Sequence, residues 1–190
     1  YYSLADFFPR FHVTAITHRR NPIYPTTVVG KPPQEDFWLG KATERIFLMP
    51  IRMAIVPELQ EMYMPAEGVA HNLVLLSLKK SFRGQVQKAA SALWGAGQMM
   101  FNKVLIAFNE DVDLKSFSET MKQLSSNVDP SKDLIFSEGP LDILDHASSD
   151  FAYGSKLALD ATNDRRLPLP QRMNAELKSK LLQEKQLVDV

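Results

Sequence analysis

The sequence predicts a layered α/β domain with a mostly parallel sheet, a long proline-rich N-terminal arm and a C-terminal helix. Three observations carry this prediction. Short, continuously apolar runs, which are typical of strands covered on both faces, alternate along the chain with longer segments of helical spacing. Four prolines crowd residues 22–33. Apolar residues at helical spacing recur near the end of the chain.

The composition fits one globular domain and excludes several kinds of site. A chain of 190 residues buries about 70% of the surface of its unfolded form, so its core needs neither disulfide nor metal. The absence of cysteine excludes thiolate zinc sites and cysteine nucleophiles. Because 22 basic residues balance 22 acidic ones, we expect no nucleic-acid partner. No apolar run has the roughly 20 residues of a membrane span, and we expect a cytoplasmic protein, with a peripheral membrane location as the alternative.

The first part of the chain is predicted to form an arm and then one long helix. Residues 10–18 alternate between apolar and polar types, which predicts a strand. The prolines of residues 22–33 remove amide donors and favour extended backbone, which indicates an ordered loop or an interface arm. Residues 34–56 predict an amphipathic helix kinked at Pro50. Its apolar residues are Phe37, Leu39, Ala42, Ile46, Met49, Met53 and Val56.

The remainder of the chain supplies the rest of the predicted sheet and its helices. Residues 57–65, bounded by prolines, are interpreted as a connection. Strands are predicted at residues 73–78, 104–108, 133–137 and 156–159, and helices at residues 85–101 and 116–124. Small residues in the first of these helices predict close packing against another backbone. A further amphipathic helix is predicted at residues 173–188, where it docks on another surface.

Residues 109–113, NEDVD, hold four polar side chains and one valine directly after a predicted strand. Their oxygens suit a divalent cation. The alternative is a strand end that leads into a helix, whose first turn favours aspartate. Consecutive carboxylates point in divergent directions and no second ligand group is evident, so we expect no metal site built within this chain. A serine-hydrolase elbow, a dinucleotide fingerprint and a phosphate-binding P-loop are also absent from the sequence.

Five segments together resemble one known family in their order and spacing. They read FPRFHVTAITHRRNPIYPTTVVGKPPQED (8–36), MYMPAEG (62–68), MMFNKVLIAFNEDVD (99–113), VDPSKD (128–133) and GPLDILDHASSDFAYGSKLALDATN (139–163). This set resembles the C-terminal domain of the UbiD decarboxylases, which use prenylated flavin to remove CO2 from aromatic and unsaturated acids. The likeness covers nearly the whole chain to residue 163.

The resemblance implies a division of the chain and of the chemistry. Residues 1–163 are the C-terminal domain, residues 1–35 its arm from a missing N-terminal flavin-binding domain, and residues 164–190 a tail helix. Because the start, Tyr1-Tyr2-Ser3, carries no initiator methionine, we expect a chain cut from a longer protein. The family's catalytic residues lie upstream. We therefore assign no catalytic residue to this chain and expect it to be inactive alone.

For the full-length protein, the resemblance implies a carboxy-lyase with prenylated FMN and a divalent metal, Mn or Mg. Its substrate is an aromatic acid, including a polyprenylated hydroxybenzoate, in ubiquinone or menaquinone biosynthesis. Its partners are a flavin prenyltransferase that supplies the cofactor and further copies of itself, joined through the C-terminal domain and tail helix. The alternative function is a non-catalytic oligomerisation or interaction domain.

The resemblance also assigns residues to a substrate pocket and a cofactor contact. The arm matches the pattern YxxTxxGxPPxE, which places Thr26, Thr27 and Glu35 beside the cleft. Glu35 also suits the first turn of a helix for electrostatic reasons alone. The other predicted pocket residues are Leu39, Met99 and Leu141. Lys103 is predicted to lean toward the cofactor phosphate, with an ordinary solvated charge as the alternative. Gly154, Ser155, Lys156 and Asp160 are predicted to keep their strand and its flanking loop in place.

Overall fold

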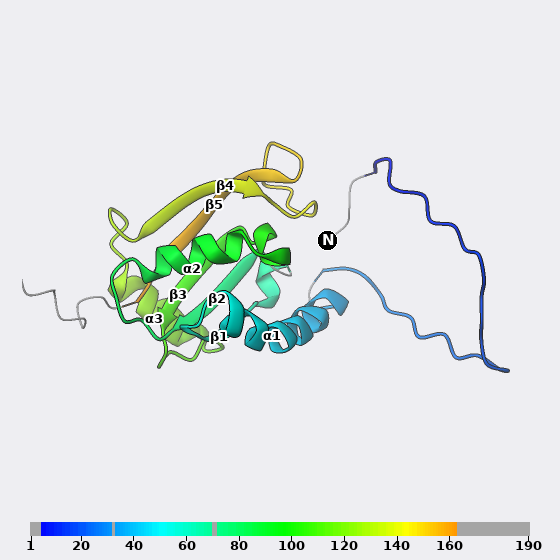
Figure 1. Cartoon of the computed structure of the whole chain (residues 1–190), viewed down its shortest axis with the longest axis horizontal. Coiled ribbons are helices and arrows are strands. Elements are labelled where there is room, and N and C mark those ends of the chain that lie inside the picture. The colour runs from blue at the N-terminus through cyan, green and yellow to red at the C-terminus, as the bar shows by residue number, and fades with distance from the viewer. Residues whose placement is uncertain (1–4, 32, 70–71, 163–190) are drawn as a thin grey trace, which may run out of the picture.

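The computed structural model describes residues 5–31, 33–69 and 72–162. Within them, one five-stranded sheet has the order β1-β2-β3-β5-β4 (Figure 1). Its strands are β1 (Leu59–Tyr63), β2 (Leu73–Leu78), β3 (Val104–Asn109), β4 (Leu134–Pro140) and β5 (Tyr153–Asp160). The three central strands are parallel to one another, and the edge strands β1 and β4 are antiparallel to their neighbours. The predicted α/β fold is confirmed.

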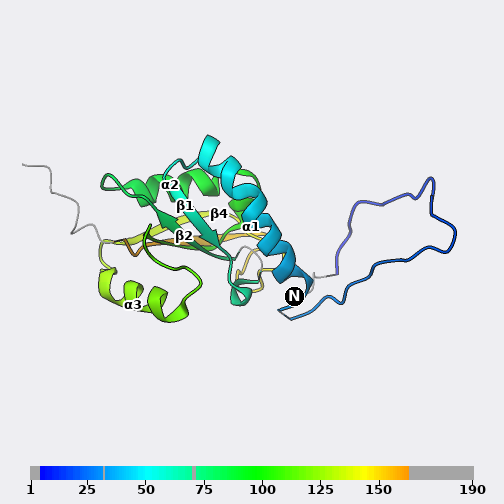
Figure 2. The same cartoon turned by 90° about the horizontal axis from the view of Figure 1, so that it is seen from below.

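Helices cover both faces of this sheet. The helices are α1 (Glu35–Ala54), α2 (Gln85–Trp94) and α3 (Phe117–Asn127), with short 3₁₀ turns η1 (Ala66–Gly68) and η2 (Gly97–Phe101). Figure 2 shows α1 and α2 on one face and α3 on the other. The Ser116 hydroxyl accepts a hydrogen bond from the Glu119 amide at 3.3 Å and so caps α3.

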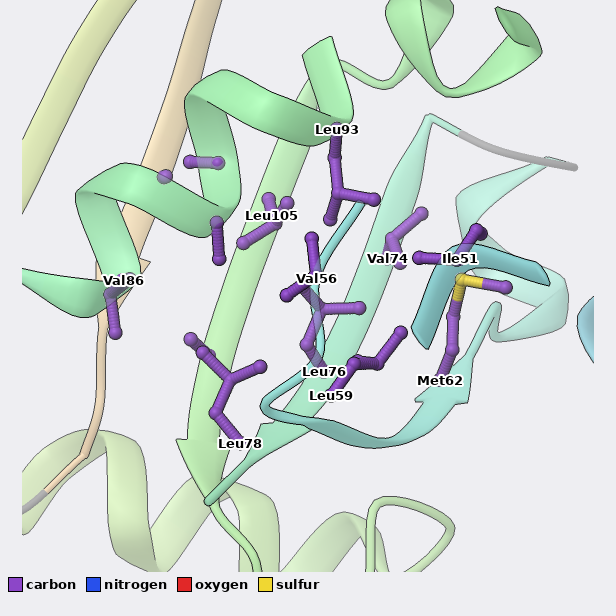
Figure 3. Close-up of a cluster of buried hydrophobic side chains, with 14 of the residues drawn as sticks. Ile51, Val56, Leu59, Met62, Val74, Leu76, Leu78, Val86, Leu93 and Leu105 are labelled. Atoms are coloured by element: carbon purple, nitrogen blue, oxygen red, sulfur yellow. The ribbon is translucent and has the colours of Figure 1, made fainter. Parts of the chain in front are cut away.

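The two layers explain why the central strands are apolar at nearly every position. On the α1 and α2 face, Val74 and Leu105 pack with Leu93 in the cluster of Figure 3. On the α3 face, Leu75 packs in a second cluster, which also contains Phe108. Neighbouring residues of one strand thus enter different cores, since side chains alternate across a strand. Both faces of β2 and β3 are therefore buried.

The structure corrects several predicted elements. The strand predicted for residues 10–18 is wrong: this segment has no regular structure, and all of residues 5–29 are exposed. A strand needs a neighbour for its backbone hydrogen bonds, and no described strand lies beside the arm, which loops away from the sheet (Figures 1 and 2). The connection predicted for residues 57–65 instead contains β1.

The helix predicted for residues 85–101 is also too long, because α2 ends at Trp94 and is followed by η2. Gly97 has φ of 51° there, a left-handed conformation that an α-helix does not accommodate. The predicted close packing of this helix is confirmed by Ala89 and Ala90, which are fully buried. The helix predicted for residues 173–188 lies outside the described residues.

Among the helices of the described residues, none combines the length and hydropathy that crossing a bilayer requires.

Candidate active-site edge of the sheet

Three of the predicted site residues meet at one edge of the sheet, the amino ends of the parallel strands β3 and β5. Met99 lies on η2, and Lys103 directly precedes β3. Leu141 follows β4, and because β4 is antiparallel to β5, its last residue pairs with Tyr153 at the start of β5. We call this edge the amino edge and define it by η2, residues 102–103, the loop of residues 141–152 and the start of β5.

Lys103 forms an ion pair with Asp145 of the loop. The Lys103 ammonium lies 2.7 Å from Asp145 Oδ2 and 3.0 Å from Oδ1. The Asp145 side chain is nearly buried, whereas that of Lys103 is 27% exposed. Burial alone raises the pKa of Asp145, but hydrogen bonds from Lys103 and from the Ala147 amide outweigh it and hold this pKa below its ordinary value. Asp145 is therefore an anion that ties the loop to the strand beside it.

Lys156, on β5, is the most deeply buried cation of the amino edge, with only 2% of its surface exposed. Its ammonium donates to the backbone carbonyl of Met100 at 2.5 Å and to that of Asn102 at 2.8 Å. Burial lowers its pKa to about 8. The amino edge thus holds two lysines, and its loop carries three aspartates, Asp142, Asp145 and Asp150, of which Asp145 pairs with Lys103.

The loop of residues 141–152 is held tightly against β5. The Leu141 amide donates to the Ala152 carbonyl at 2.9 Å, and the Leu141 side chain is buried. A Cβ atom on Gly154 would lie 2.6 Å from Ser148 Oγ and 2.9 Å from Leu141 Cδ1. Only glycine permits this close approach of loop and strand. Leu141 therefore acts on the edge by fixing its shape from beneath.

The other predicted pocket residues come from the arm and α1. Thr26 and Thr27 are exposed on the arm. Glu35 begins α1, and Leu39 on its second turn is 62% exposed. Figure 1 shows the first turns of α1 at the same end of the molecule as η2 and the β4–β5 loop. The place of Thr26, Thr27, Glu35 and Leu39 in a pocket stays a prediction.

Polar side chains hold the inner face of α1 against the sheet. Glu44 is buried and accepts hydrogen bonds from the Met64 amide and, at 2.7 Å, from the Lys41 ammonium. Lys41 also donates to the Met64 carbonyl at 2.8 Å. Arg45 pairs with Glu61 of β1, and this hydrogen bond lowers the pKa of Glu61. Because of these bonds, α1 is fixed to β1 by charges.

The outer face of α1 is apolar and exposed. We call it the α1 stripe, and its residues are Trp38, Leu39, Ile46, Phe47, Met49 and Met53. The sequence predicted the helix and most of these residues as its apolar face. This face does not pack on the domain's own sheet. Ile51, on the other face of α1, packs in the core there instead.

The opposite edge of the sheet, at the carboxyl ends of the parallel strands, holds a closed buried pair. The Lys80 ammonium lies 2.8 Å from Asp160 Oδ2 and 2.8 Å from Thr162 Oγ1. This bond crosses from the end of β2 to the end of β5 and confirms that Asp160 ties its strand to a neighbouring segment. Here the buried lysine has a carboxylate partner.

The acidic segment of residues 109–113 also lies at this carboxyl edge and forms a turn. The Val112 amide donates to the Asn109 carbonyl at 3.2 Å, and Asp113 accepts the Lys115 amide at 2.9 Å. Within the part of the chain that the structure describes, no three histidine, cysteine or acidic side chains gather closely enough to hold a metal ion.

The sequence reasoning missed several residues that build these edges. Asp145 lies in a polar stretch that gives no sign of a loop folding back onto β3. Asn102 is fully buried, accepts from Trp94 Nε1 at 3.3 Å and donates to the Val104 carbonyl at 2.9 Å. Lys80 and Glu44 are charges at buried positions, which no periodicity distinguishes from exposed ones. Among the buried charges of the two edges, the sequence had indicated Lys156 and Asp160, as part of a motif expected to keep its strand in place.

Two family descriptions match the chain. Residues 37–161 match the 3-octaprenyl-4-hydroxybenzoate carboxy-lyase C-terminal domain, and residues 1–32 match the Rift-related domain of the same enzymes. The boundary between the matches falls where the arm meets α1. The fold and its two matched parts therefore define the class of protein: the family described as 3-octaprenyl-4-hydroxybenzoate carboxy-lyases.

Relatives and solved structures agree with this class. An uncharacterised protein of Archaeoglobus fulgidus is 42% identical over 189 residues, which cover 95% of this chain and 39% of the relative. The closed form of vanillic acid decarboxylase from Sedimentibacter hydroxybenzoicus matches with a TM-score of 0.71 and 25% identity, over 92% of this chain and 38% of the enzyme. The chain belongs to the UbiD family, and it spans well under half the length of these relatives.

A more distant neighbour supports the fold alone. The UbiD-class enzyme HmfF from Pelotomaculum thermopropionicum, solved in a dimeric form with prFMN, matches with a TM-score of 0.57 and 19% identity over 85% of this chain and 35% of that one.

Proposed function

We propose that this chain is the C-terminal lobe of a nonoxidative decarboxylase that removes CO2 from an aromatic acid with prenylated flavin. The observation that carries the proposal is the amino edge, in a chain of the UbiD family. At that edge the Lys103 ammonium pairs with Asp145 and still remains partly exposed. The flavin phosphate is an anion, and a partly exposed ammonium is a group that binds phosphate by charge-assisted hydrogen bonds.

Lys103 is the residue that we propose to contact the phosphate of the flavin. Its side chain remains partly exposed beside Asp145, so its ammonium has donors left for a second anion. Lys156 is too deeply buried for this role. When bound, the flavin would supply an electrophilic ring for the decarboxylation, and Lys103 would hold its phosphate. Since the described residues contain no group of metal ligands, we propose that Mn or Mg takes its ligands from the rest of the full-length protein.

We propose that the substrate pocket is lined from this side by Thr26, Thr27, Glu35, Leu39 and Met99, with the buried Leu141 supporting it from beneath. Exposed apolar side chains such as Leu39 suit the ring of an aromatic acid or a prenyl chain. The prolines of the arm restrict its unbound conformations, which reduces the entropy lost when it closes on a ligand. The active enzyme would then need both lobes, and the present chain alone is expected to be inactive.

Further proposals concern the biological setting. The description of the matched family, a carboxy-lyase of polyprenylated hydroxybenzoate, supports a role in ubiquinone or menaquinone biosynthesis. A flavin prenyltransferase would supply the cofactor. We propose a cytoplasmic enzyme, with peripheral membrane association as the alternative, because a polyprenylated substrate partitions into lipid.

The test of the function is CO2 release by the full-length protein reconstituted with prenylated FMN and Mn²⁺, assayed with a panel of aromatic acids. We expect turnover of at least one acid by the full-length protein and none by residues 1–190. Leu39→Trp should change the preference among acids, because it narrows the pocket, while the matched variant Lys122→Met on the distant α3 should not. Absence of both turnover and flavin binding in the full-length protein would refute the decarboxylase assignment.

The α1 stripe favours a second candidate function, oligomerisation through this domain. Six exposed apolar side chains along one helix face are typical of an interaction site. The other element proposed for this contact, the tail helix, lies outside the described residues. Light scattering should detect a dimer or larger assembly of the chain, and the pair Ile46→Lys and Met53→Lys should reduce its mass to that of a monomer. Unchanged mass in this variant would place the subunit contact elsewhere.

A further inference from the structure

We propose that Lys156 is a positioning residue that fixes the segment of residues 99–103, and through it the direction of the Lys103 ammonium, at the amino edge. The inference rests on the proposed function, in which Lys103 contacts the flavin phosphate. It assigns to Lys156 no contact with ligand. Its effect passes through the backbone of the neighbouring segment.

One short stretch of β5 binds several backbone groups of the segment of residues 99–103. The Lys156 ammonium binds the carbonyls of Met100 and Asn102. The next residue, Leu157, donates its amide to the Lys103 carbonyl at 2.9 Å. Two consecutive residues of β5 thus hold three of the four carbonyls from position 100 to position 103. The turn that links the predicted pocket residue to the predicted phosphate contact is defined by these bonds.

The segment itself begins in a 3₁₀ turn that has few hydrogen bonds of its own. In η2 the Met99 amide donates to the Ala96 carbonyl at 3.1 Å, and the Asn102 amide donates to the Met99 carbonyl at 3.0 Å. Such 3₁₀ turns are short and poorly stabilised by their own hydrogen bonds. External donors are therefore needed to hold the end of η2 in one position, and the Lys156 ammonium is such a donor.

The charge of Lys156 is paired differently from that of a second buried lysine, Lys80. The bonds found for the Lys156 ammonium all go to carbonyls, whereas the buried Lys80 of the opposite edge is paired with a carboxylate. Burying a cation without a countercharge is costly, and an apolar side chain fills a core position at lower cost. A lysine at this position is better explained by its hydrogen bonds than by core packing. Its ammonium donates strong hydrogen bonds to carbonyls that converge on one point.

The Lys156 side chain passes close to a glycine of the neighbouring strand. A Cβ atom on Gly139, which pairs with Gly154 across β4 and β5, would lie 3.2 Å from Lys156 Cε. The Lys156 stem therefore runs over a glycine of the neighbouring strand with no spare room. Gly139→Ala should shift the lysine stem by a few tenths of an ångström while leaving its charge and length unchanged. It provides a second, independent variant for the test.

The first experiment measures amide hydrogen exchange of residues 97–103 in the 190-residue chain, without flavin. Lys156→Met should accelerate exchange in this segment about tenfold or more, because its closed form loses two strong hydrogen bonds. Gly139→Ala should have a smaller effect in the same direction, and Lys122→Met on α3 should have none. Unchanged exchange in both Lys156→Met and Gly139→Ala would overturn the inference. If Lys156→Met does not fold, Gly139→Ala decides the test.

The second experiment measures FMN affinity of the full-length protein by fluorescence titration. Lys103→Met and Lys156→Met should each weaken binding about tenfold, and the double variant should bind about as weakly as Lys103→Met alone, because both act through one contact. A loss in Lys103→Met without one in Lys156→Met would overturn the inference and leave the proposed function intact. Full affinity in both single variants would instead refute the proposed phosphate contact and, with it, the role of Lys156.

Discussion

The two edges of the sheet hold their buried lysines in different ways. At the carboxyl edge, Lys80 meets Asp160 and Thr162, so the charges cancel. At the amino edge, Lys156 meets only carbonyls, and Lys103 shares Asp145 while remaining partly exposed. Open sheets of parallel strands usually bind ligands at their carboxyl ends. The lysine that we propose to bind ligand, Lys103, lies at the other end, and what distinguishes it from Lys80 is its partial exposure to solvent.

The largest expected effect belongs to the closed pair. Lys80→Met should lower the free energy of unfolding by about 3 to 5 kcal/mol, because it leaves the Asp160 carboxylate without its countercharge in a largely buried position. Denaturant titration measures this loss. The matched control is Lys79→Met, which changes the exposed neighbour and should alter stability by less than about 0.5 kcal/mol. Equal effects of the two variants would contradict the contrast between the edges.

The next effect concerns pH and Lys156. Its pKa is lowered to about 8 in the folded chain, against about 10.4 when unfolded. Between these values the unfolded chain holds a proton that the folded chain has released, so this lysine makes stability rise with pH. The stability of the wild type relative to Lys156→Met should therefore increase by on the order of 3 kcal/mol from pH 8 to pH 10.5. A constant difference across this window would show that the lysine is not desolvated.

The smallest expected effect on stability belongs to Lys103. Lys103→Met should cost about 1 to 3 kcal/mol in the 190-residue chain, because it leaves the nearly buried Asp145 carboxylate without its countercharge, while the Ala147 amide still donates to that carboxylate. The same titration compares it with Lys80→Met. A loss as large as that of Lys80→Met would mean that both edges are structural, and the proposed contrast between them would fail.

The central part of the fold was predictable from the sequence, because β2 and β3 are continuous apolar runs with both faces buried. The short strand β1 was not, since a register shift between Leu59 and Glu61 interrupts its alternation. In residues 10–18 the alternation is clear, yet the segment forms no strand in this chain. Periodicity reports a preference, and the strand forms only where a neighbour completes its hydrogen bonds.

The amino edge could be predicted only in part. Short motifs indicated Met99, Lys103 and Leu141, but the pairing of Lys103 with Asp145 joins residues far apart in the sequence. It depends on the loop lying against Gly154, where any side chain would collide. The apolar spacing of α1 predicted a helix correctly and gave no sign that its charged side would face the sheet. Which face is buried depends on what the neighbouring elements offer, and this is not a local property.

The ion pair and the apolar side chains of α1 respond in opposite ways to dissolved salt. The contacts of Arg45 with Glu61 are partly open to solvent, so dissolved ions screen them and loosen the attachment of the helix to its own sheet. Salting-out anions such as sulfate strengthen the burial of apolar groups, so they favour contacts of the α1 stripe with whatever covers it. Adding ammonium sulfate therefore screens the pair of Arg45 with Glu61, while it strengthens the apolar contacts of the α1 stripe and those of Ile51 with the sheet.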